Sequence, residues 1–364
     1  MGNTIAPARA AVDYYRSMRF RSIEGRQEVR RSGCACASLR VGDRTLHVRR
    51  GLVVAIACAG VSGVSLFLHR SAPVLAADAV PVQPPDPGEA PAMKGFKPVL
   101  GQEGRDVVWL PTPTAITLRM LEIARVGPAD RVVDLGSGDG RIPIAAASAF
   151  GARAVGVEFS PGMVALARDL AARAGVSERV RFVQGDLFAY DFRDATVVTL
   201  FLTNALNLKL RPALLALPPG TRVVSHLFTM ADWLPDERQV LDERAIHLWV
   251  VPAEVGGHWR GKVGPMPAAA PGPVAPFTID LKLTQTFQIV EGGALRDGRF
   301  IGIERLRLRG DELAFEWVQS APDDTTRVQF VARVERDRLI GTVSVGGRSV
   351  PLLLARVPEA SPGQ

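Results

Sequence analysis

The residues with the clearest chemical potential form a glycine-rich segment, residues 132–140, with the sequence VVDLGSGDG. An apolar run leads into it and a helical pattern follows, as in a loop between a buried strand and a helix. Gly136, Gly138 and Gly140 have no side chains, so the backbone of such a loop can press against a ligand. Dinucleotide-binding loops have the spacing G-x-G-x-x-G, whereas this loop has G-x-G-x-G followed by Arg141. The loop alone does not exclude a nicotinamide dinucleotide.

Three carboxylates lie where the expected strands end. Asp134 ends the first strand and can face a cationic group, such as the α-amino group or the sulfonium of S-adenosylmethionine (SAM). Glu158 ends the second strand, where an acidic side chain can accept both hydroxyls of a ribose. Asp186 follows the third strand and could accept the adenine amino group, with Leu187 or Phe188 against the ring. Together these positions predict SAM as the cofactor.

Other residues near the loop have less definite roles. Ser137 is included among the predicted cofactor-binding residues, and Asp139 is expected to stabilise the turn. Structural alternatives are an ordinary acid before a helix for Glu158 and a turn residue for Asp186. His226 is a weak candidate for a catalytic base or substrate contact, and a structural histidine at a strand end is an equal alternative. The sequence leaves the general base unknown.

The elements that must position these residues alternate between strand and helix patterns. Strands are expected at residues 132–135, 154–157, 180–183, 196–202, 221–225 and 246–251, and helices around residues 116–123, 141–149, 163–170 and 206–217. Thr112 or Thr114 is expected to cap the first helix, and Ser160 with Pro161 to begin the third. The alternation predicts an α/β fold with a doubly wound, Rossmann-like sheet over residues 106–255.

A change of period marks a second domain. Residues 256–276 are rich in Gly, Pro and Ala and are expected to form a linker. From Phe277 onward apolar and polar residues alternate, as in Ile279, Leu281 and Leu283. Residues 277–357 are therefore expected to form a small antiparallel all-β domain, a barrel or sandwich of about six strands.

Charge is concentrated at the amino terminus. Residues 1–50 contain 11 Arg and four acids, which leaves 33 basic and 33 acidic residues in the rest of the chain. This tail is expected to be disordered, and the balanced remainder offers no basic surface for nucleic acid. The three cysteines all precede residue 59, so no metal site is predicted in the globular region.

Residues 51–68 form an uncharged, mostly apolar run of 18 residues. The run predicts a transmembrane helix or a cleaved signal segment, with a buried core helix as a further alternative. The preceding arginines would place the amino terminus inside and the remainder outside the cytoplasm, or in the periplasm if the run is cleaved. That placement conflicts with SAM, which is a cytoplasmic metabolite. Residues 69–105 are Pro-rich and are expected to be a linker.

Several motifs match one known family. They are WLPTP at 109–113, DLGSGDGRI at 134–142, GDLF at 185–188, NLKLRP at 207–212, VSH at 224–226 and LWVVP at 248–252. Together they resemble class I SAM-dependent methyltransferases related to the mitochondrial lysine methyltransferases of the ATP synthase c-subunit and the adenine nucleotide translocase. The resemblance covers about residues 105–260, and those enzymes also carry a hydrophobic segment before the catalytic domain.

The resemblance implies a protein substrate with a lysine acceptor, which can be a membrane protein. It implies that Thr112, within Pro111-Thr112-Pro113, lies over the cofactor, and that the ligands of SAM include Asp134, Gly136, Glu158 and Asp186. One departure concerns the acceptor. The family pattern after Ser-His is acidic, like Ser-His-Asp-Phe-Asp, whereas this chain continues from His226 with Leu-Phe-Thr.

Two further sequence features bear on the substrate. Residues 199–204 lack the Asn/Asp-Pro-Pro-aromatic signature of methylation on base amino groups and glutamine amides, which disfavours those acceptors. The missing acids and the hydrophobic segment favour a second hypothesis, an exported or membrane-tethered binding scaffold on a methyltransferase fold without activity. The intact glycine loop and Glu158 oppose that hypothesis.

Overall fold

The computed structural model describes residues 40–41, 44–45, 96–102, 104, 108–264, 266–267, 273–274, 276–321 and 324–358. By their internal contacts the residues divide into two units, Asp13–Asp86 and the remainder. In the first unit only the short strands β1 (Arg40–Val41) and β2 (Arg44–Thr45) are described. The predicted hydrophobic segment, residues 51–68, lies outside the described residues. Within the described ranges, no helix is both long and apolar enough to cross a membrane.

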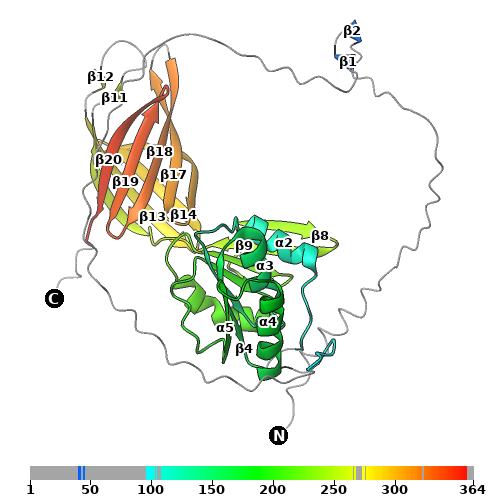
Figure 1. The fold of residues 1–364 in the computed structure, drawn as a ribbon. Helices are drawn as coiled ribbons and strands as arrows, with labels where there is room; N and C mark the ends of the chain where they lie inside the picture. The colour runs from blue at the N-terminus through cyan, green and yellow to red at the C-terminus, as the bar shows by residue number, and fades with distance from the viewer. Residues whose placement is uncertain are drawn as a thin grey trace, which may run out of the picture. The chain divides into compact units, whose positions relative to one another are not determined.

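A seven-stranded sheet forms the first domain, in the order β5-β4-β3-β6-β7-β9-β8 (Figure 1). Its strands are β3 (Arg131–Leu135), β4 (Arg153–Glu158), β5 (Val180–Gln184), β6 (Val197–Leu200), β7 (Arg222–His226), β8 (Glu237–Leu241) and β9 (Arg244–Val250). The first five are parallel, which confirms the doubly wound prediction, and β9 runs antiparallel to both of its neighbours. The tight turn between β8 and β9 has positive φ at Asp242 (48°) and Glu243 (59°), which is typical of a two-residue hairpin.

Separate apolar clusters cover the two faces of this sheet. One joins β3, β4, β6 and β7 to the helices α2 (Thr114–Ile123), α3 (Arg141–Phe150) and α4 (Pro161–Arg173). The other joins the opposite face of the same strands to α5 (Asn204–Leu215). The sequence predicts this arrangement because strands buried on both faces are apolar at successive positions, as in Val132 and Val133.

Helix starts follow the expected chemistry at one helix and depart from it at another. The Ser160 side chain accepts a hydrogen bond from Met163 N, with Pro161 as the first helical residue, as predicted. At α2 the N-cap position is Pro113 and no side chain caps the helix. The expected cap from Thr112 or Thr114 is therefore wrong, and Thr112 takes part in a different contact, described below.

The second domain is a nine-stranded antiparallel sheet in the order β15-β14-β13-β10-β20-β19-β18-β17-β16. Its strands are β10 (Gly257–Val263), β13 (Phe277–Thr286), β14 (Ile289–Arg296), β15 (Arg299–Ile301), β16 (Ile303–Arg309), β17 (Glu312–Ala321), β18 (Asp324–Glu335), β19 (Arg338–Val345) and β20 (Arg348–Arg356). The two edge strands, β15 and β16, are separated in the chain by Gly302 alone, so the sheet must curl until its edges meet. The all-β prediction is confirmed, as a nearly closed barrel around Trp259, Phe315 and Phe330.

Strand β10 corrects the predicted linker at residues 256–276. The glycine content suggested flexibility, but Trp259 and Val263 are fully buried in the barrel. A Cβ atom on Gly261 would lie 2.1 Å from the carbonyl oxygen of Leu353 on β20, so this glycine permits close strand pairing. Of the rest of that segment, the structure describes the short strands β11 (Met266–Pro267) and β12 (Pro273–Val274).

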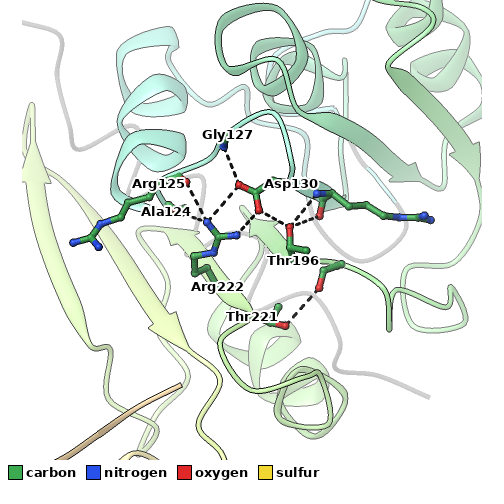
Figure 2. Close-up of polar contacts among 9 residues, drawn as sticks. Ala124, Arg125, Gly127, Asp130, Thr196, Thr221 and Arg222 are labelled. Carbon is green, nitrogen blue, oxygen red and sulfur yellow. Dashed lines mark hydrogen bonds and ion pairs between the residues drawn. The ribbon is translucent and has the colours of Figure 1, made fainter. Parts of the chain in front are cut away.

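A polar network ties together the amino-terminal edge of the seven-stranded sheet, where β3, β6 and β7 begin (Figure 2). Asp130 accepts hydrogen bonds from Gly127 N at 2.8 Å and Thr196 Oγ1 at 2.7 Å, and it forms an ion pair with Arg222. The Arg222 guanidinium also donates to the carbonyl oxygens of Ala124 at 2.9 Å and Arg125 at 3.1 Å, at the end of α2. This network is structural, because its donors and acceptors pair with one another.

Candidate cofactor and acceptor site

The glycine loop lies at the carboxyl edge of the sheet, between β3 and α3. Gly138 (φ 54°) and Gly140 (φ 78°) adopt the left-handed conformation, which other L residues enter at a cost. A Cβ on Gly140 would lie 2.4 Å from Phe182 Cζ, and one on Gly138 would lie 2.7 Å from Trp109 Nε1. The third glycine therefore packs the helix start against the sheet, and the second allows Trp109 to approach the loop.

Asp134 ends β3 and is buried beneath the loop. The Thr199 hydroxyl donates to its Oδ1 at 2.6 Å. Burial raises the pKa of Asp134 to about 7, and the nearby carboxylates of Glu158 and Asp139 act in the same direction, against the bond from Thr199. A cationic ligand beside this carboxylate would offset both effects, so Asp134 has the chemistry that an α-amino or sulfonium group requires.

Glu158, at the end of β4, organises the loop. One carboxylate oxygen accepts from Gly138 N and the other from Ser160 N, each at 2.9 Å. Each oxygen keeps a further lone pair, so the carboxylate can still accept ribose hydroxyls from a bound nucleoside. Glu158 thus connects the glycine loop to the start of α4 as well as fitting its predicted role.

Asp139 and Arg141 connect the loop to the Pro-Thr-Pro segment. The Arg141 guanidinium donates to both carboxylate oxygens of Asp139, at 3.0 and 2.6 Å, and to the carbonyl oxygen of Thr112 at 2.8 Å. The expectation that Asp139 stabilises the turn agrees with these contacts. Arg141, which the sequence analysis noted only as a departure from a dinucleotide motif, positions Thr112 over the loop.

The other predicted residues have mixed surroundings. Asp186 Oδ1 accepts from Phe188 N at 2.9 Å, as in the turn alternative, while Leu187 Cδ2 lies 3.9 Å from a Cβ built on Gly136. The Ser137 hydroxyl is buried against Gly156 of β4, with no hydrogen-bond partner in the part of the chain that the structure describes. Binding of the cofactor by Ser137 and Asp186 stays a prediction.

His226 ends β7 on the same edge and is fully buried. Its Nδ1 lies 3.5 Å from Thr112 Oγ1, and its ring centroid lies 4.1 Å from that of Phe201. Its Nε2 has no partner among the described residues. Burial lowers the pKa of His226 to about 3, with a contribution from Arg244, so the imidazole is neutral at physiological pH. Such a weak base cannot take a proton from a lysine ammonium of pKa about 10.4, which argues against the role of base.

Sequence reasoning missed four side chains at this edge. Phe159, directly after Glu158, is half exposed, and an exposed aromatic side chain next to a candidate ribose ligand would have been a usable signal. Trp109 lies against the glycine loop, and Phe201 lies between His226 and Phe228. Asn207 of α5 is buried, and its amide donates to Ser225 Oγ at 3.4 Å. No sequence pattern pointed to the last three, because they lie far apart along the chain.

These features fit SAM. Close approach to the backbone is available at the glycine loop, a buried carboxylate with a raised pKa awaits a cation, and a second carboxylate is held for a ribose. Asp134 and Glu158 would hold the amino-acid and ribose parts, with Leu187 and Phe159 beside the base. No cluster of metal-binding side chains occurs in the described ranges, and none is required for this chemistry.

Comparisons with known proteins agree with this site. The model of the ANTKMT methyltransferase domain matches residues 134–237. A protein-lysine N-methyltransferase of Saccharolobus islandicus is 47% identical over 36% of this chain and 83% of its own length. The adenine nucleotide translocase lysine N-methyltransferase of Mus musculus is 43% identical over 30% of this chain, which spans 48% of that relative.

One solved structure is also similar in sequence. It is described as an RNA methyltransferase from Salinibacter ruber in complex with S-adenosyl-L-homocysteine, and it is 50% identical over 40% of this chain and 96% of its own, with a TM-score of 0.40. Neither these comparisons nor the site geometry favours the inactive-scaffold hypothesis. The cofactor is SAM, and the chain belongs to the family of SAM-dependent methyltransferases that includes the Saccharolobus protein-lysine N-methyltransferase and the mitochondrial translocase and ATP synthase c-subunit lysine methyltransferases.

Proposed function

We propose that this enzyme transfers the methyl group of SAM to the ε-amino group of a lysine in a protein. The relatives that bear protein-lysine names support this acceptor class. The observation that carries the proposal is the uncharged wall beside the glycine loop, in which Phe201 lies between the neutral His226 and Phe228, with ring centroids 4.1 and 6.2 Å away. Such a wall suits the aliphatic stem of lysine and favours the neutral amine that must attack.

The bound cofactor supplies an activated methyl group on a sulfonium, so the protein mainly has to orient the two reactants. Asp134 and Glu158 fix the donor side, and Thr112 and His226 fix the acceptor side. The lysine ammonium loses its proton before transfer. We infer that this proton leaves to solvent, because His226 is too weak a base and apolar walls make the neutral amine easier to reach.

The absence of acids after His226 fits this mechanism. Leu227 and Thr229 stand where the family pattern has acids, and acids there would stabilise the ammonium form of the acceptor. We infer that this chain selects its lysine through the partner protein's surface and the apolar wall, and less through ion pairing at the ε-amino group.

The test uses the full chain and SAM carrying a radiolabelled methyl group, incubated with an extract of cellular protein and RNA. We expect protein-bound label that survives ribonuclease and is recovered as N-methyl-lysine after complete hydrolysis. A Glu158→Ala chain serves as the negative control. Label that disappears with ribonuclease, or that is recovered on an amino acid other than lysine, would overturn the lysine assignment.

A further inference from the structure

The loop between β7 and β8, residues 227–236, begins directly after His226 and is anchored at two places. The near anchor lies within the methyltransferase domain. Asn204 Oδ1 accepts from Thr229 N at 2.9 Å, and His247 Nε2 lies 3.2 Å from the carbonyl oxygen of Leu227. Leu227 itself adopts a left-handed conformation, with φ 67°. This conformation is unfavourable for leucine, so the loop must be held in place by its surroundings.

The far anchor is Trp233, which is fully buried. The indole of Trp249 on β9 lies 6.0 Å from that of Trp233, and its Nε1 donates to the carbonyl oxygen of Trp233 at 2.8 Å. On another side the ring of Phe287 stacks on Trp233 at 6.0 Å with an interplanar angle of 27°. Phe287 belongs to the turn between β13 and β14, so the C-terminal domain supplies part of this anchor.

Gln288, the next residue of that turn, completes the anchor with both ends of its amide. Its Oε1 accepts from Trp233 Nε1 at 3.0 Å, and its Nε2 donates to the carbonyl oxygen of Leu234 at 2.6 Å. The guanidinium of Arg211, on α5, lies 5.5 Å from the Phe287 ring and donates to the carbonyl oxygen of Met230 at 3.2 Å. The loop is therefore clamped between α5, β9 and the β13–β14 turn.

The identity of Phe287 is informative because the turn itself does not favour it. The turn has two residues between the strands, and Phe287 has φ 54°. Such positions favour Gly, Asn or Asp, and a bulky residue costs on the order of 1 kcal/mol. The chain nevertheless has an aromatic side chain here, and its ring is used on Trp233. The strained residue thus indicates a role outside the turn.

The turn is also fixed from behind. Gln285 accepts from Val255 N at 2.6 Å and donates to the carbonyl oxygens of Ala253 and Phe287, at 2.8 and 2.7 Å. These bonds tie the turn to residues 253–255, the chain that leaves β9. The turn therefore reaches Trp233 from a fixed base.

We propose that the β13–β14 turn of the C-terminal domain positions the acceptor side of the active site. Phe287 and Gln288 fix Trp233 and Leu234, and this fixes the loop that begins at His226 and carries Phe228. The proposal rests on the proposed function, since it assumes that His226 and Phe228 face the lysine. It gives the C-terminal domain a role in catalysis while leaving the SAM-binding residues, on β3 and β4, outside its influence.

The test compares two ligands on the full-length chain by calorimetry. One is S-adenosylhomocysteine. The other is a bisubstrate conjugate in which a nitrogen replaces the sulfonium and carries the adenosyl group, the amino-acid chain of SAM and a lysine side chain. In the unaltered chain we expect the conjugate to bind more tightly. Phe287→Ala and Gln288→Ala should weaken conjugate binding at least tenfold and change S-adenosylhomocysteine binding less than twofold.

Three further variants sharpen the result. Phe287→Gly relieves the turn strain but removes the ring, so it should weaken conjugate binding like Phe287→Ala, whereas Phe287→Tyr should restore it. Phe300→Ala removes an exposed phenylalanine of the same domain, 73% exposed, and should change neither affinity. If the unaltered chain shows no preference for the conjugate, the lysine function fails. If it does and Phe287→Ala keeps the preference, or loses both affinities equally, the positioning role is overturned.

Discussion

The two edges of the seven-stranded sheet use buried polar groups in opposite ways. At the amino edge, Asp130 accepts from Gly127, Thr196 and Arg222, and the partners are bonded in turn (Figure 2). At the carboxyl edge, Ser137 Oγ, Asn207 Oδ1 and His226 Nε2 are buried without a partner among the described residues. Burying an unpaired polar atom costs about 1–3 kcal/mol. A protein keeps such atoms where a ligand will meet them, so the contrast distinguishes the functional edge from the structural one.

The pKa values of two buried aspartates show the same contrast. Burial alone would raise the pKa of Asp130, but the hydrogen bonds from Arg222, Thr196 and Gly127 outweigh it, and the pKa is lowered. Burial raises the pKa of Asp134 to about 7, since Thr199 is its principal donor and two acids lie nearby. Asp130 is already paired with a cation, whereas Asp134 obtains a cation only from the ligand.

The largest expected effect breaks the amino edge. Arg222→Met removes the cation that pairs with a largely buried carboxylate, and we expect it to lower the free energy of unfolding by about 3 kcal/mol. SAM affinity, measured by calorimetry below the unfolding transition, should change less than twofold. Because the folded-state pKa of Asp130 is depressed, its contribution is present above pH 4 and is lost as the pH falls through the folded value. Unchanged stability in Arg222→Met would remove the distinction between the edges.

The next effect breaks the carboxyl edge. Glu158→Ala removes the acceptor of Gly138 N and Ser160 N and the predicted ribose ligand, and we expect SAM to bind about 30-fold more weakly, which is about 2 kcal/mol. Glu178→Ala, on the surface after α4, is the matched control and should bind SAM normally. Normal binding by Glu158→Ala would show that its role is confined to the loop backbone.

A third prediction uses the raised pKa of Asp134. Its ionised form should bind the cationic cofactor, so SAM affinity should rise about tenfold between pH 6 and pH 8. In the ligand-free protein the sign is opposite, because a raised acid pKa gives stability below pH 4 that is lost as the pH rises through about 7. Calorimetry in buffers of different ionisation enthalpy should detect proton release on binding. Asp134→Asn should abolish that release, and its persistence would assign the proton elsewhere.

The smallest effect concerns His226. Its substitution by Asn keeps a polar side chain toward Thr112, and we expect kcat/KM for methyl transfer to fall about fivefold, about 1 kcal/mol. The pH profile of the unaltered enzyme should rise with the ionisation of the acceptor and show no inflection near pH 6.5, because the pKa of His226 is about 3. An inflection near 6.5 that disappears in His226→Asn would restore His226 as a base.

The cofactor half of the site was predictable because its residues are local in sequence. Asp134 and the glycines lie in one segment, and Glu158 ends the next strand, so strand periodicity and loop spacing place them at one edge. The acceptor half was not. Trp109, Phe201 and Asn207 come from three elements, and only the order β3-β6-β7 and the placement of α5 bring them to His226.

The sequence by itself determined the fold class, the position of the glycine loop and the all-β character of residues after 277, because backbone hydrogen bonding imposes periods of 3.6 and 2 on buried side chains. Only the tertiary structure decided three other features. These are the barrel strand within the expected linker, the neutrality of His226 and the docking of Phe287 on Trp233. Each depends on which distant groups exclude water from a residue or press against it, and that information is not contained in local spacing.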